Sequence, residues 1–343
     1  MRTRAYDRPM SNLPASFRAF VVDKPKDAGF SRGVRDVATR ELPPGEVTVR
    51  VTWSSVNYKD GLAAREDGKV ARTHPLIPGI DLAGTVVASD DPAFPVGSAA
   101  LAHGYDIGVA RHGGFGELAR VPSAWTVALP RALSPREAME IGTAGFTAAM
   151  SVVALEERGL RPGDGPVLVT GASGGVGSAA VAILASRGHE VWAATGKADE
   201  HGRLRDLGAA GFLTRDEVTA PGRPLERERW AGAVDTVGAA TLPYVLRTLR
   251  IGAAVASSGN ASGAELATTV FPFILRGCAL LGMDSANMAI DRRRALWGRL
   301  ASDLLPRGVA DGITEVALDT LESALDAIHA GEARGRWVVR VAG

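Results

Sequence analysis

Residues 167–185, VLVTGASGGVGSAAVAILA, constrain the fold more than any other part of the 343-residue chain. An apolar run typical of a buried strand leads into Gly171, Gly174 and Gly177, and an apolar, helix-like segment follows. Such glycines permit a tight turn, close approach of the backbone to a pyrophosphate and close packing of helix on strand. The first N–H groups of the helix then hold the phosphate. The segment predicts a dinucleotide site, and a glycine-rich turn that serves packing alone is the alternative.

Further short apolar runs flank this segment at 191–195, 211–214, 232–237, 253–258 and 279–283. Helix-length segments at 175–187 and 239–250 lie between some of them. Alternating helices and near-continuous apolar strands indicate a parallel sheet that is covered on both faces. Six strands predict an α/β, doubly wound Rossmann domain. We place it at residues 141–285, which hold 22 of the 41 glycines.

The rest of the chain follows other patterns. Residues 17–140 show strand-like alternation at 46–53 (EVTVRVTW), frequent Pro and Gly, and little helical period, which predicts a small β-rich domain with long loops. Residues 286–343 open with a helix-like run and end in RWVVRV at 336–341, a strand that we expect to return to the first domain. Residues 1–16 are expected to form a loose N-terminal extension.

Composition and charge narrow the classes of partner. The chain has 39 Lys and Arg against 38 Asp and Glu, so its charge favours neither nucleic acid nor an anionic membrane. No stretch of about 18 apolar residues predicts a membrane span, and the start has no apolar core for a signal peptide. Cys278, the single cysteine, can form neither an internal disulfide nor a multi-thiolate zinc site. We therefore expect a soluble, cytoplasmic, metal-free protein.

The end of the second apolar run bears on the choice of dinucleotide. An acid there would bind the ribose 2′-hydroxyl of NADH, whereas a basic residue would accommodate the 2′-phosphate of NADPH. The run ends in Thr195, Gly196 and Lys197, without a carboxylate at its tip. Thr195 and Lys197 can donate to a phosphate, so we expect NADPH. Because Asp199 and Glu200 lie nearby, a solvated loop lysine remains the alternative for Lys197.

Several motifs carry a resemblance to a known family: PPGEVTVRV at 43–51, SSVNYKDGLA at 54–63, PLIPGIDLAGTV at 75–86, GGFGELARVP at 113–122, IGTAGFTAAM at 141–150 and TGASGGVG at 170–177. With them the chain resembles the zinc-free, quinone-oxidoreductase-like branch of the medium-chain dehydrogenase/reductase superfamily. NYKD, IGTAGFTA, WAGAVDTVG at 230–238 and FPFILRG at 271–277 look like the narrower group of bacterial NADPH-dependent acrylyl-CoA reductases. The resemblance implies a GroES-like catalytic domain at 17–140, and a homodimer.

The resemblance also implies a reaction. Zinc-bearing relatives place a cysteine and a histidine where this chain has Asn57, Tyr58, Lys59 and Asp60. The expected chemistry is therefore reduction of a carbon–carbon double bond that a neighbouring carbonyl activates. Hydride from NADPH would reach the β-carbon of a short enoyl-CoA, acrylyl-CoA above all, and a proton would reach its α-carbon. NADPH:quinone oxidoreduction is the alternative among enzymes, and a non-catalytic NADPH-binding structural or redox-sensing protein is the alternative of another class.

The expected catalytic residues are Tyr58, Asn57 and Asp60. The Tyr58 hydroxyl could donate a hydrogen bond or a proton, with packing at a strand end as its alternative. Asn57 would orient the same region, while Lys59 and Asp60 could instead be an exposed pair. Helix capping is the alternative for Thr143. By resemblance, the residues expected to contact the cofactor are Tyr58, Thr143, Thr147, Ser173, Gly174, Gly175, Val176, Thr195, Gly196, Lys197, Thr236, Leu280 and Arg294.

The anionic substrate calls for local cations, because coenzyme A carries several phosphate charges. Arg292, Arg293 and Arg294 form the densest basic run in the sequence. These arginines are candidates for contact with coenzyme A, and a solvated helix face is the alternative.

Overall fold

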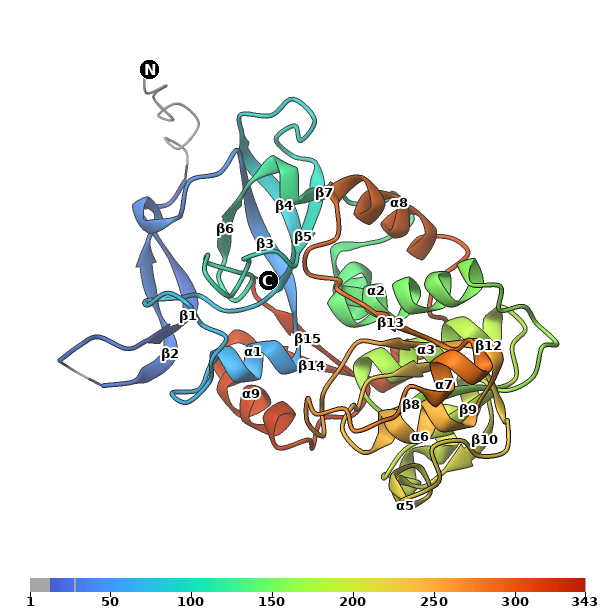
Figure 1. The fold of residues 1–343 in the computed structure, drawn as a ribbon. Helices are drawn as coiled ribbons and strands as arrows, with labels where there is room; N and C mark the ends of the chain where they lie inside the picture. Colours follow the sequence, from blue (N-terminus) through green and yellow to red (C-terminus); the bar gives the residue numbers. More distant parts are fainter. Residues whose placement is uncertain (1–12, 28, 343) are drawn as a thin grey trace.

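A six-stranded parallel sheet forms one half of the molecule in the computed structural model, which describes residues 13–27 and 29–342 (Figure 1). The strand order is β10-β9-β8-β11-β12-β13. The strands are β8 (Val167–Thr170), β9 (Val191–Ala194), β10 (Ala209–Leu213), β11 (Trp230–Asp235), β12 (Leu249–Ser257) and β13 (Ala279–Gly282). Each apolar run of the sequence forms one strand, which confirms the doubly wound Rossmann sheet. The order reverses between β8 and β11, where such sheets bind ligands beyond the carboxyl ends of the strands.

Helices cover both faces of this sheet. Along β8, Val167 and Val169 pack into one core with α2 and α3, whereas Leu168 packs into a second core with α6. This alternation is the two-residue period of a strand that is buried on both sides. The helices of this half are α2 (Pro135–Glu157), α3 (Gly175–Ser186), α4 (His201–Asp206), α5 (Arg215–Thr219), α6 (Thr241–Thr248) and α7 (Phe271–Arg276).

The other half of the molecule is rich in antiparallel strands. A seven-stranded sheet has the order β14-β15-β3-β4-β5-β7, and β6 also pairs with β3; β1 and β2 form a separate hairpin. These strands are β1 (Ser16–Asp23), β2 (Ser31–Ala38), β3 (Val47–Val56), β4 (Asp81–Ser89), β5 (Ala99–His103), β6 (Leu118–Val121), β7 (Thr126–Ala128), β14 (Ile313–Ala317) and β15 (Arg336–Arg340). Together the two halves confirm the predicted fold class.

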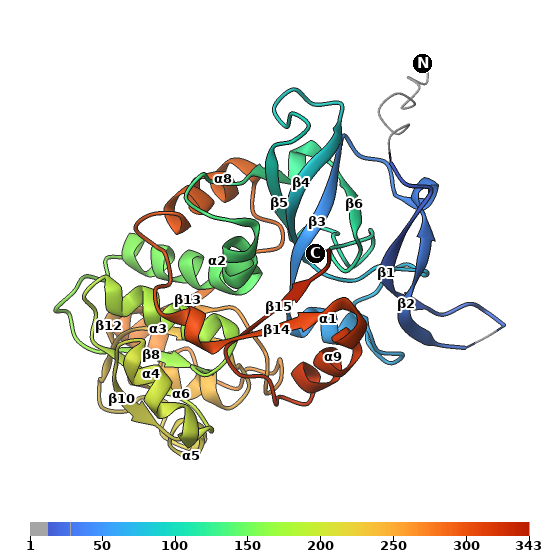
Figure 2. The same cartoon turned by 180° about the vertical axis from the view of Figure 1, so that it is seen from behind.

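The C-terminal segment crosses between the halves. Its helix α8 (Ile290–Leu300) packs on α2, and α9 (Leu321–His329) packs on α1 (Tyr58–Ala63). β15 then pairs antiparallel with β3, so the last strand lies in the sheet built by the first part of the chain, as Figure 2 shows from behind. Short 3₁₀ helices lie at Thr39–Glu41, Ser123–Trp125, Ala198–Glu200, Val309–Gly312 and Leu318–Thr320. Of the expected N-terminal extension, residues 1–12 lie outside the described residues, and Ser16 already belongs to β1.

Helix α2 begins earlier than its sequence suggests. Ser134 caps it: the Ser134 hydroxyl accepts from the Glu137 N–H, and Glu137 accepts from the Ser134 N–H. A second helical stretch begins beside Thr143, after a kink at Gly142. The Thr143 hydroxyl donates to Asp81 and accepts from none of the described helix N–H groups, so it does not cap this start. At Gly142 the helix is interrupted by a left-handed φ of 49°. Within the described residues, α2 is long and apolar enough to span a membrane, but 72% of its apolar window is buried inside the protein, as in a core helix.

Candidate active site

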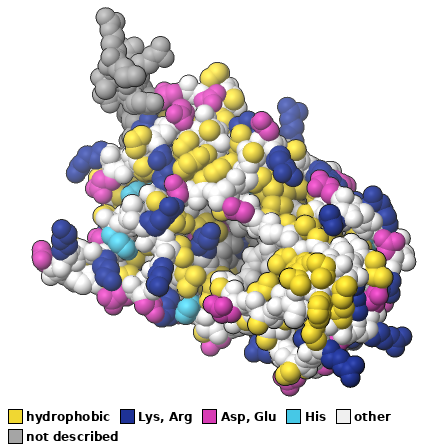
Figure 3. All heavy atoms as spheres, viewed as in Figure 1, with side chains coloured by type: hydrophobic (Ala, Val, Ile, Leu, Met, Phe, Trp, Pro, Cys, Tyr) yellow, Lys and Arg dark blue, Asp and Glu magenta, His cyan; other side chains and the backbone are white. Residues whose placement is uncertain are grey.

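A cleft of about 580 Å³ lies where the two halves of the molecule meet. Figure 3 shows the hollow near the centre of this face. The parallel-sheet half contributes the glycine turn after β8 and the ends of β11 and β12, while the antiparallel half contributes α1 and the segment after β5. Of the residues expected at the site, the cleft is lined by Asn57, Tyr58, Thr143, Thr147, Gly174, Gly175, Val176 and Thr236.

The turn between β8 and α3 fits a phosphate. Gly171 has a left-handed φ of 60°, and a Cβ at Gly177 would lie 2.3 Å from the Gly171 carbonyl oxygen, so both positions require glycine. Gly174 caps α3 without any side-chain hydrogen bond. The first N–H groups of a helix lack partners within the helix, and Gly175 and Val176 line the cleft. These donors suit the diphosphate of a dinucleotide.

The end of β9 gathers hydroxyls and cations. Ser173 Oγ and Thr195 Oγ1 lie 3.0 Å apart, and the Lys197 N–H donates to Thr195 Oγ1. Lys197 Nζ donates to two backbone carbonyl oxygens, those of Gly331 (2.9 Å) and Ala333 (2.8 Å). Burial, and then the neighbouring charge of Arg334, lower the pKa of Lys197. Lys197 is thus an anchored side chain and not a freely solvated one.

A further cation near this strand end is absent from the residues expected from sequence. The guanidinium of Arg215 comes within 3.2 Å of the position that a Cβ at Gly196 would occupy. Asp199 does not compete for the same place, because it pairs with Arg334 at 2.6 Å. Ser173, Thr195, Gly196 and Lys197 do not line the cleft itself. With Arg215 they form a basic edge that suits a 2′-phosphate.

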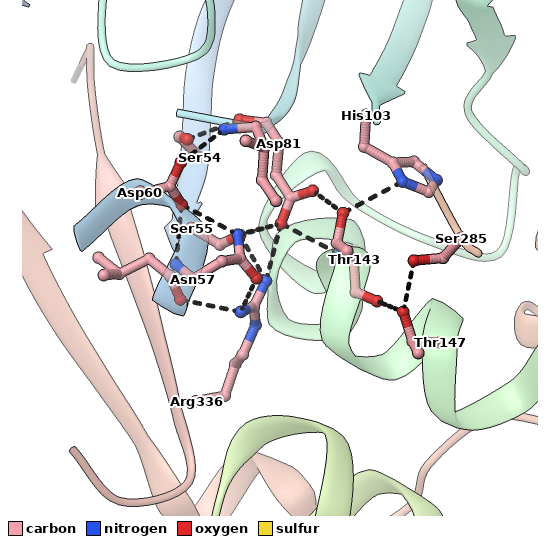
Figure 4. A network of polar contacts seen from close by, with 12 residues as sticks. Ser54, Ser55, Asn57, Asp60, Asp81, His103, Thr143, Thr147, Ser285 and Arg336 are labelled. Carbon is pink, nitrogen blue, oxygen red and sulfur yellow. Dashed lines mark hydrogen bonds and ion pairs between the residues drawn. The ribbon is translucent and has the colours of Figure 1, made fainter. Parts of the chain in front are cut away.

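A buried polar network underlies the other end of the cleft (Figure 4). Its centre is Asp81 at the start of β4, which is completely buried. Asp81 Oδ2 accepts from Arg336 Nη2 and Asn57 Nδ2, both at 2.9 Å, and from the Thr143 N–H at 3.0 Å. The hydroxyl of Ser55 also donates to it. Burial alone would raise the pKa of Asp81, but Arg336 and the other donors outweigh burial and lower it to about 2.

Asp60 lies in the same network, contrary to the interpretation of Lys59 and Asp60 as an exposed pair. Asp60 is completely buried, whereas Lys59 is exposed and lines the cleft. Asp60 Oδ1 accepts from the Ile80 N–H at 2.9 Å, and Oδ2 accepts from the Asn57 N–H at 2.8 Å. Burial, and then the charge of Asp81, raise the pKa of Asp60 to about 7. Asp60 does not line the cleft, so it acts on the site by holding Asn57.

His103 extends the network toward α8. The indole N–H of Trp297 donates to His103 Nε2 at 2.9 Å, and Arg293 Nη1 lies 2.8 Å from Nδ1 and 2.9 Å from Nε2. Nδ1 lies 3.2 Å from the Thr143 hydroxyl, which in turn donates to Asp81. Burial, and then the charge of Arg293, lower the pKa of His103 to about 3 and keep the ring neutral.

Three further expected residues that line the cleft carry hydroxyl groups. Tyr58 is 40% exposed at the start of α1, and its ring stacks on that of His329 with centroids 6.0 Å apart. The Thr147 hydroxyl lies 2.7 Å from the Thr143 carbonyl oxygen and 2.8 Å from Ser285 Oγ. The Thr236 hydroxyl donates to the Thr170 carbonyl at 3.0 Å.

Besides the residues at the end of β9, two more residues expected to contact the cofactor do not line the cleft. Leu280, on the edge strand β13, is partly exposed, and Arg294, on α8, donates to the Thr126 carbonyl at 3.2 Å. Neither lines the cleft. Arg293 is completely buried, so the run 292–294 is not one exposed basic cluster. Among the described residues, no three His, Cys, Asp or Glu side chains are grouped to hold a metal ion.

Sequence reasoning missed the two residues at the heart of the network. Asp81 and Arg336 are separated by 255 positions and meet only because β15 pairs with β3. Each is a charge at the edge of an apolar strand, in GIDLAGTV and RWVVRV. A charged residue that begins a buried strand must be paired, and this was the available signal.

Comparison with known proteins places the chain in a family. Residues 43–131 match the alcohol dehydrogenase GroES-like domain. The chain is 47% identical to the AcuI protein of Escherichia coli over 316 residues, which are 92% of this chain and 97% of that protein. It is 46% identical over 327 residues to the acrylyl-CoA reductase AcuI of Ruegeria pomeroyi, with 95% of this chain and 99% of that protein covered.

YhfP of Bacillus subtilis, whose name assigns it provisionally to the quinone oxidoreductases, is 45% identical over 95% of this chain and 99% of its own length. Its crystal structure with NAD bound superposes with a TM-score of 0.92, 44% identity, and 95% of this chain and 100% of that chain covered. The YhdH oxidoreductase of Salmonella enterica in complex with NADP gives a TM-score of 0.91 at 48% identity, with 95% and 100% covered. The chain therefore belongs to the AcuI/YhdH family of GroES-like medium-chain oxidoreductases.

Proposed function

We propose that the protein is a cytoplasmic NADPH-dependent reductase that converts acrylyl-CoA to propionyl-CoA. The observation that carries this proposal is the cleft at which a glycine turn suited to phosphate and a buried, hydrogen-bonded acid network meet. Relatives named acrylyl-CoA reductase at 46–47% identity support the substrate. The reaction adds one hydride and one proton across the double bond and leaves NADP⁺.

The nucleotide would be held along the cleft and at the basic edge beside it. The N–H groups at the start of α3, at Gly175 and Val176, bind the diphosphate. Thr195, Lys197 and Arg215 bind the 2′-phosphate at the end of β9. Thr143, Thr147 and Thr236 line the cleft and would contact the rest of the cofactor. The cofactor, when bound, supplies the hydride for the β-carbon of the enoyl thioester.

The polar network around Asp81 fixes the position of Asn57, and Asn57 and Tyr58 line the substrate end of the cleft. Asn57 is fixed on three sides, because its N–H and Nδ2 donate to Asp60, Nδ2 donates to Asp81, and Oδ1 accepts from Arg336 Nη1 at 2.8 Å. Tyr58 follows directly in the chain and is placed by this fixed neighbour. Its hydroxyl donates to the thioester oxygen as negative charge develops there, and a proton from solvent water then reaches the α-carbon.

Quinone reduction is the second candidate, and the name of YhfP is the observation in its favour. Steady-state oxidation of NADPH, followed by its absorbance with acrylyl-CoA and then with a quinone, separates the two reactions. We expect kcat/KM to be far higher for acrylyl-CoA, and faster turnover of the quinone would overturn the proposal. Tight NADPH binding without oxidation by either acceptor would instead favour a non-catalytic, redox-sensing protein.

Lys59 is the cation best placed for the phosphates of coenzyme A. It is exposed, lines the cleft and forms no salt bridge with any described residue. Replacing Lys59 with Ala is expected to raise KM for acrylyl-CoA severalfold and to leave KM for the uncharged acrylyl-pantetheine thioester unchanged. An equal rise for both thioesters would remove Lys59 from phosphate binding.

We also propose that the protein is a homodimer through the free edge of β13. Apolar side chains are exposed on the neighbouring strand β12, at Ile251 (72%), and on α7 and its N-cap, at Val270 (61%), Ile274 (68%) and Leu275 (60%). The helix α7 packs on β12. An Ile274→Asp, Leu275→Asp protein should run as a monomer in size-exclusion chromatography with light scattering. Val96→Asp, at an equally exposed site of the other half, is the control. A wild-type monomer would contradict this assembly.

A further inference from the structure

Arg293, on α8, carries a permanent charge yet is completely buried. No carboxylate forms a salt bridge with it anywhere in the described part of the chain. A buried cation is costly unless other groups solvate it. Here the groups are carbonyl oxygens, the ring nitrogens of His103 and aromatic faces. The rings of Tyr105 and Phe146 lie 4.5 Å and 5.3 Å from the Arg293 Cζ.

The carbonyl groups that solvate Arg293 belong to two distant segments. Nη1 donates to the His103 carbonyl at 2.9 Å, at the end of β5. Nη2 donates to the carbonyls of Ser285 (2.9 Å) and Ala286 (3.0 Å), in the loop that follows β13. Both segments line the cleft, through Gly104 and Tyr105 on one side and residues 284–286 on the other. The guanidinium of Arg293 thus connects two segments that line the cleft, although Arg293 itself does not line it.

The same two segments also bind each other directly. The Tyr105 N–H donates to the Ala286 carbonyl at 2.8 Å, and the Tyr105 hydroxyl donates to the Met288 carbonyl at 2.8 Å. Tyr105 has a left-handed φ of 50°, a costly conformation for a residue other than glycine. A Cβ at Gly104 would lie 2.8 Å from the Ala286 carbonyl oxygen and 3.0 Å from Arg293 Nη2. The segment at 104–105 and the loop at 284–288 therefore pack so closely that a side chain at position 104 would not fit between them.

The loop is shaped to remain in this position. Asp284 Oδ1 accepts from the N–H groups of Ala286 and Asn287, so the turn is closed on itself. Ser285 Oγ meets the Thr147 hydroxyl on α2. Because Arg293 holds the carbonyl side of this loop, it sets where Ser285 and Ala286 present their other atoms to the cleft.

We propose that Arg293 is a positioning residue for the reductase reaction. It fixes the loop at 284–288 against Gly104 and Tyr105, and so determines the width of the substrate end of the cleft without touching the substrate. This inference rests on the proposed function for its kinetic consequence, but the anchoring of the loop can be measured without any substrate.

Two variants test the anchor at different points. Arg293→Met removes the charge and the donors and keeps the length of the side chain, while Tyr105→Phe removes only the hydroxyl bond to Met288. Arg292→Met, at the exposed neighbouring position of α8, is the matched control. We expect Arg293→Met to raise KM for acrylyl-CoA about tenfold, with a smaller rise for Tyr105→Phe. The dissociation constant for NADPH should change less than about twofold, and Arg293→Lys should recover part of the loss.

Hydrogen–deuterium exchange of the free protein supplies the second measurement. Amides at 284–288 should exchange faster in Arg293→Met and Tyr105→Phe than in the wild type or Arg292→Met. Wild-type exchange and wild-type KM in folded Arg293→Met would overturn the proposal, as would equal losses of NADPH and substrate affinity. If Arg293→Met does not fold, Tyr105→Phe decides alone by the same criteria. A wild type that fails to reduce acrylyl-CoA refutes the proposed function, and the exchange rates still decide the role of Arg293.

Discussion

Asp60 and Asp81 are two completely buried carboxylates that share one donor, because Asn57 Nδ2 lies 3.2 Å from Asp60 Oδ2 and 2.9 Å from Asp81 Oδ2. Arg336 neutralises Asp81 alone. Their pKa values are therefore displaced in opposite directions, to about 7 for Asp60 and about 2 for Asp81. Near neutral pH, Asp81 keeps its charge while Asp60 exchanges a proton.

Stability should depend on pH through Asp60. Its pKa rises from 3.8 to about 7 on folding, so its contribution to the free energy of unfolding is fully present below about pH 4 and falls as pH rises toward 7. Asp81 has the opposite sign: its contribution is present above about pH 4 and is lost as pH falls toward 2. Urea unfolding of the wild type between pH 4 and 8 should show the decline due to Asp60.

An Asp60→Asn protein provides the comparison for this decline. The amide cannot titrate, so its unfolding free energy should vary less between pH 4 and 7. It should also be less stable by about 1–3 kcal/mol. The N–H groups of Ile80 and Asn57 both donate to the carboxylate, and in the variant the amide NH₂ would face one of them without forming a hydrogen bond. The same decline in both proteins would show that another group titrates.

Gly142 leaves the space that the Asp81–Arg336 pair occupies. A Cβ there would lie 1.9 Å from Arg336 Nη2 and 2.7 Å from Asp81 Oδ2, at a left-handed φ. Gly142→Ala should therefore lower the free energy of unfolding by about 3 kcal/mol or more and abolish turnover. Gly298→Ala, in an open position of α8, is the control and should stabilise the protein by about 0.5–1 kcal/mol. Similar unfolding curves for the two variants would contradict this account.

Local pattern and long-range contact account for what the sequence could and could not predict. The strands of the parallel sheet are continuous apolar runs such as 167–170, and the glycine turn follows the first of them. Both features are local in the sequence, so both could be predicted from it. The pairing of Asp81 with Arg336 depends on how β15 joins β3. The burial of Asp60 likewise depends on tertiary structure. Asp60 accepts from the N–H of Asn57, just before α1, and from the N–H of Ile80, which is 20 residues away.

The preference for NADPH should depend on Lys197 and Arg215 together. Each provides a cation at the end of β9, one anchored on backbone carbonyls and one beside Gly196. Replacement of either by Ala should raise KM for NADPH about tenfold and KM for NADH less than twofold. Lys26→Ala, in the β1–β2 hairpin, removes the same charge far from the site and should change neither. Equal losses for both nucleotides would remove the altered residue from the phosphate site.

Tyr58 carries the most direct test of the chemistry, because its hydroxyl can be removed without its ring. Tyr58→Phe keeps the stacking on His329 and the place of the side chain in the cleft. If the hydroxyl donates to the thioester oxygen as charge develops, kcat should fall about 100-fold, while KM, NADPH affinity and Tm stay near wild type. Tyr244→Phe, a buried tyrosine of α6, controls for loss of a hydroxyl elsewhere. Wild-type kcat in Tyr58→Phe would return Tyr58 to a packing role.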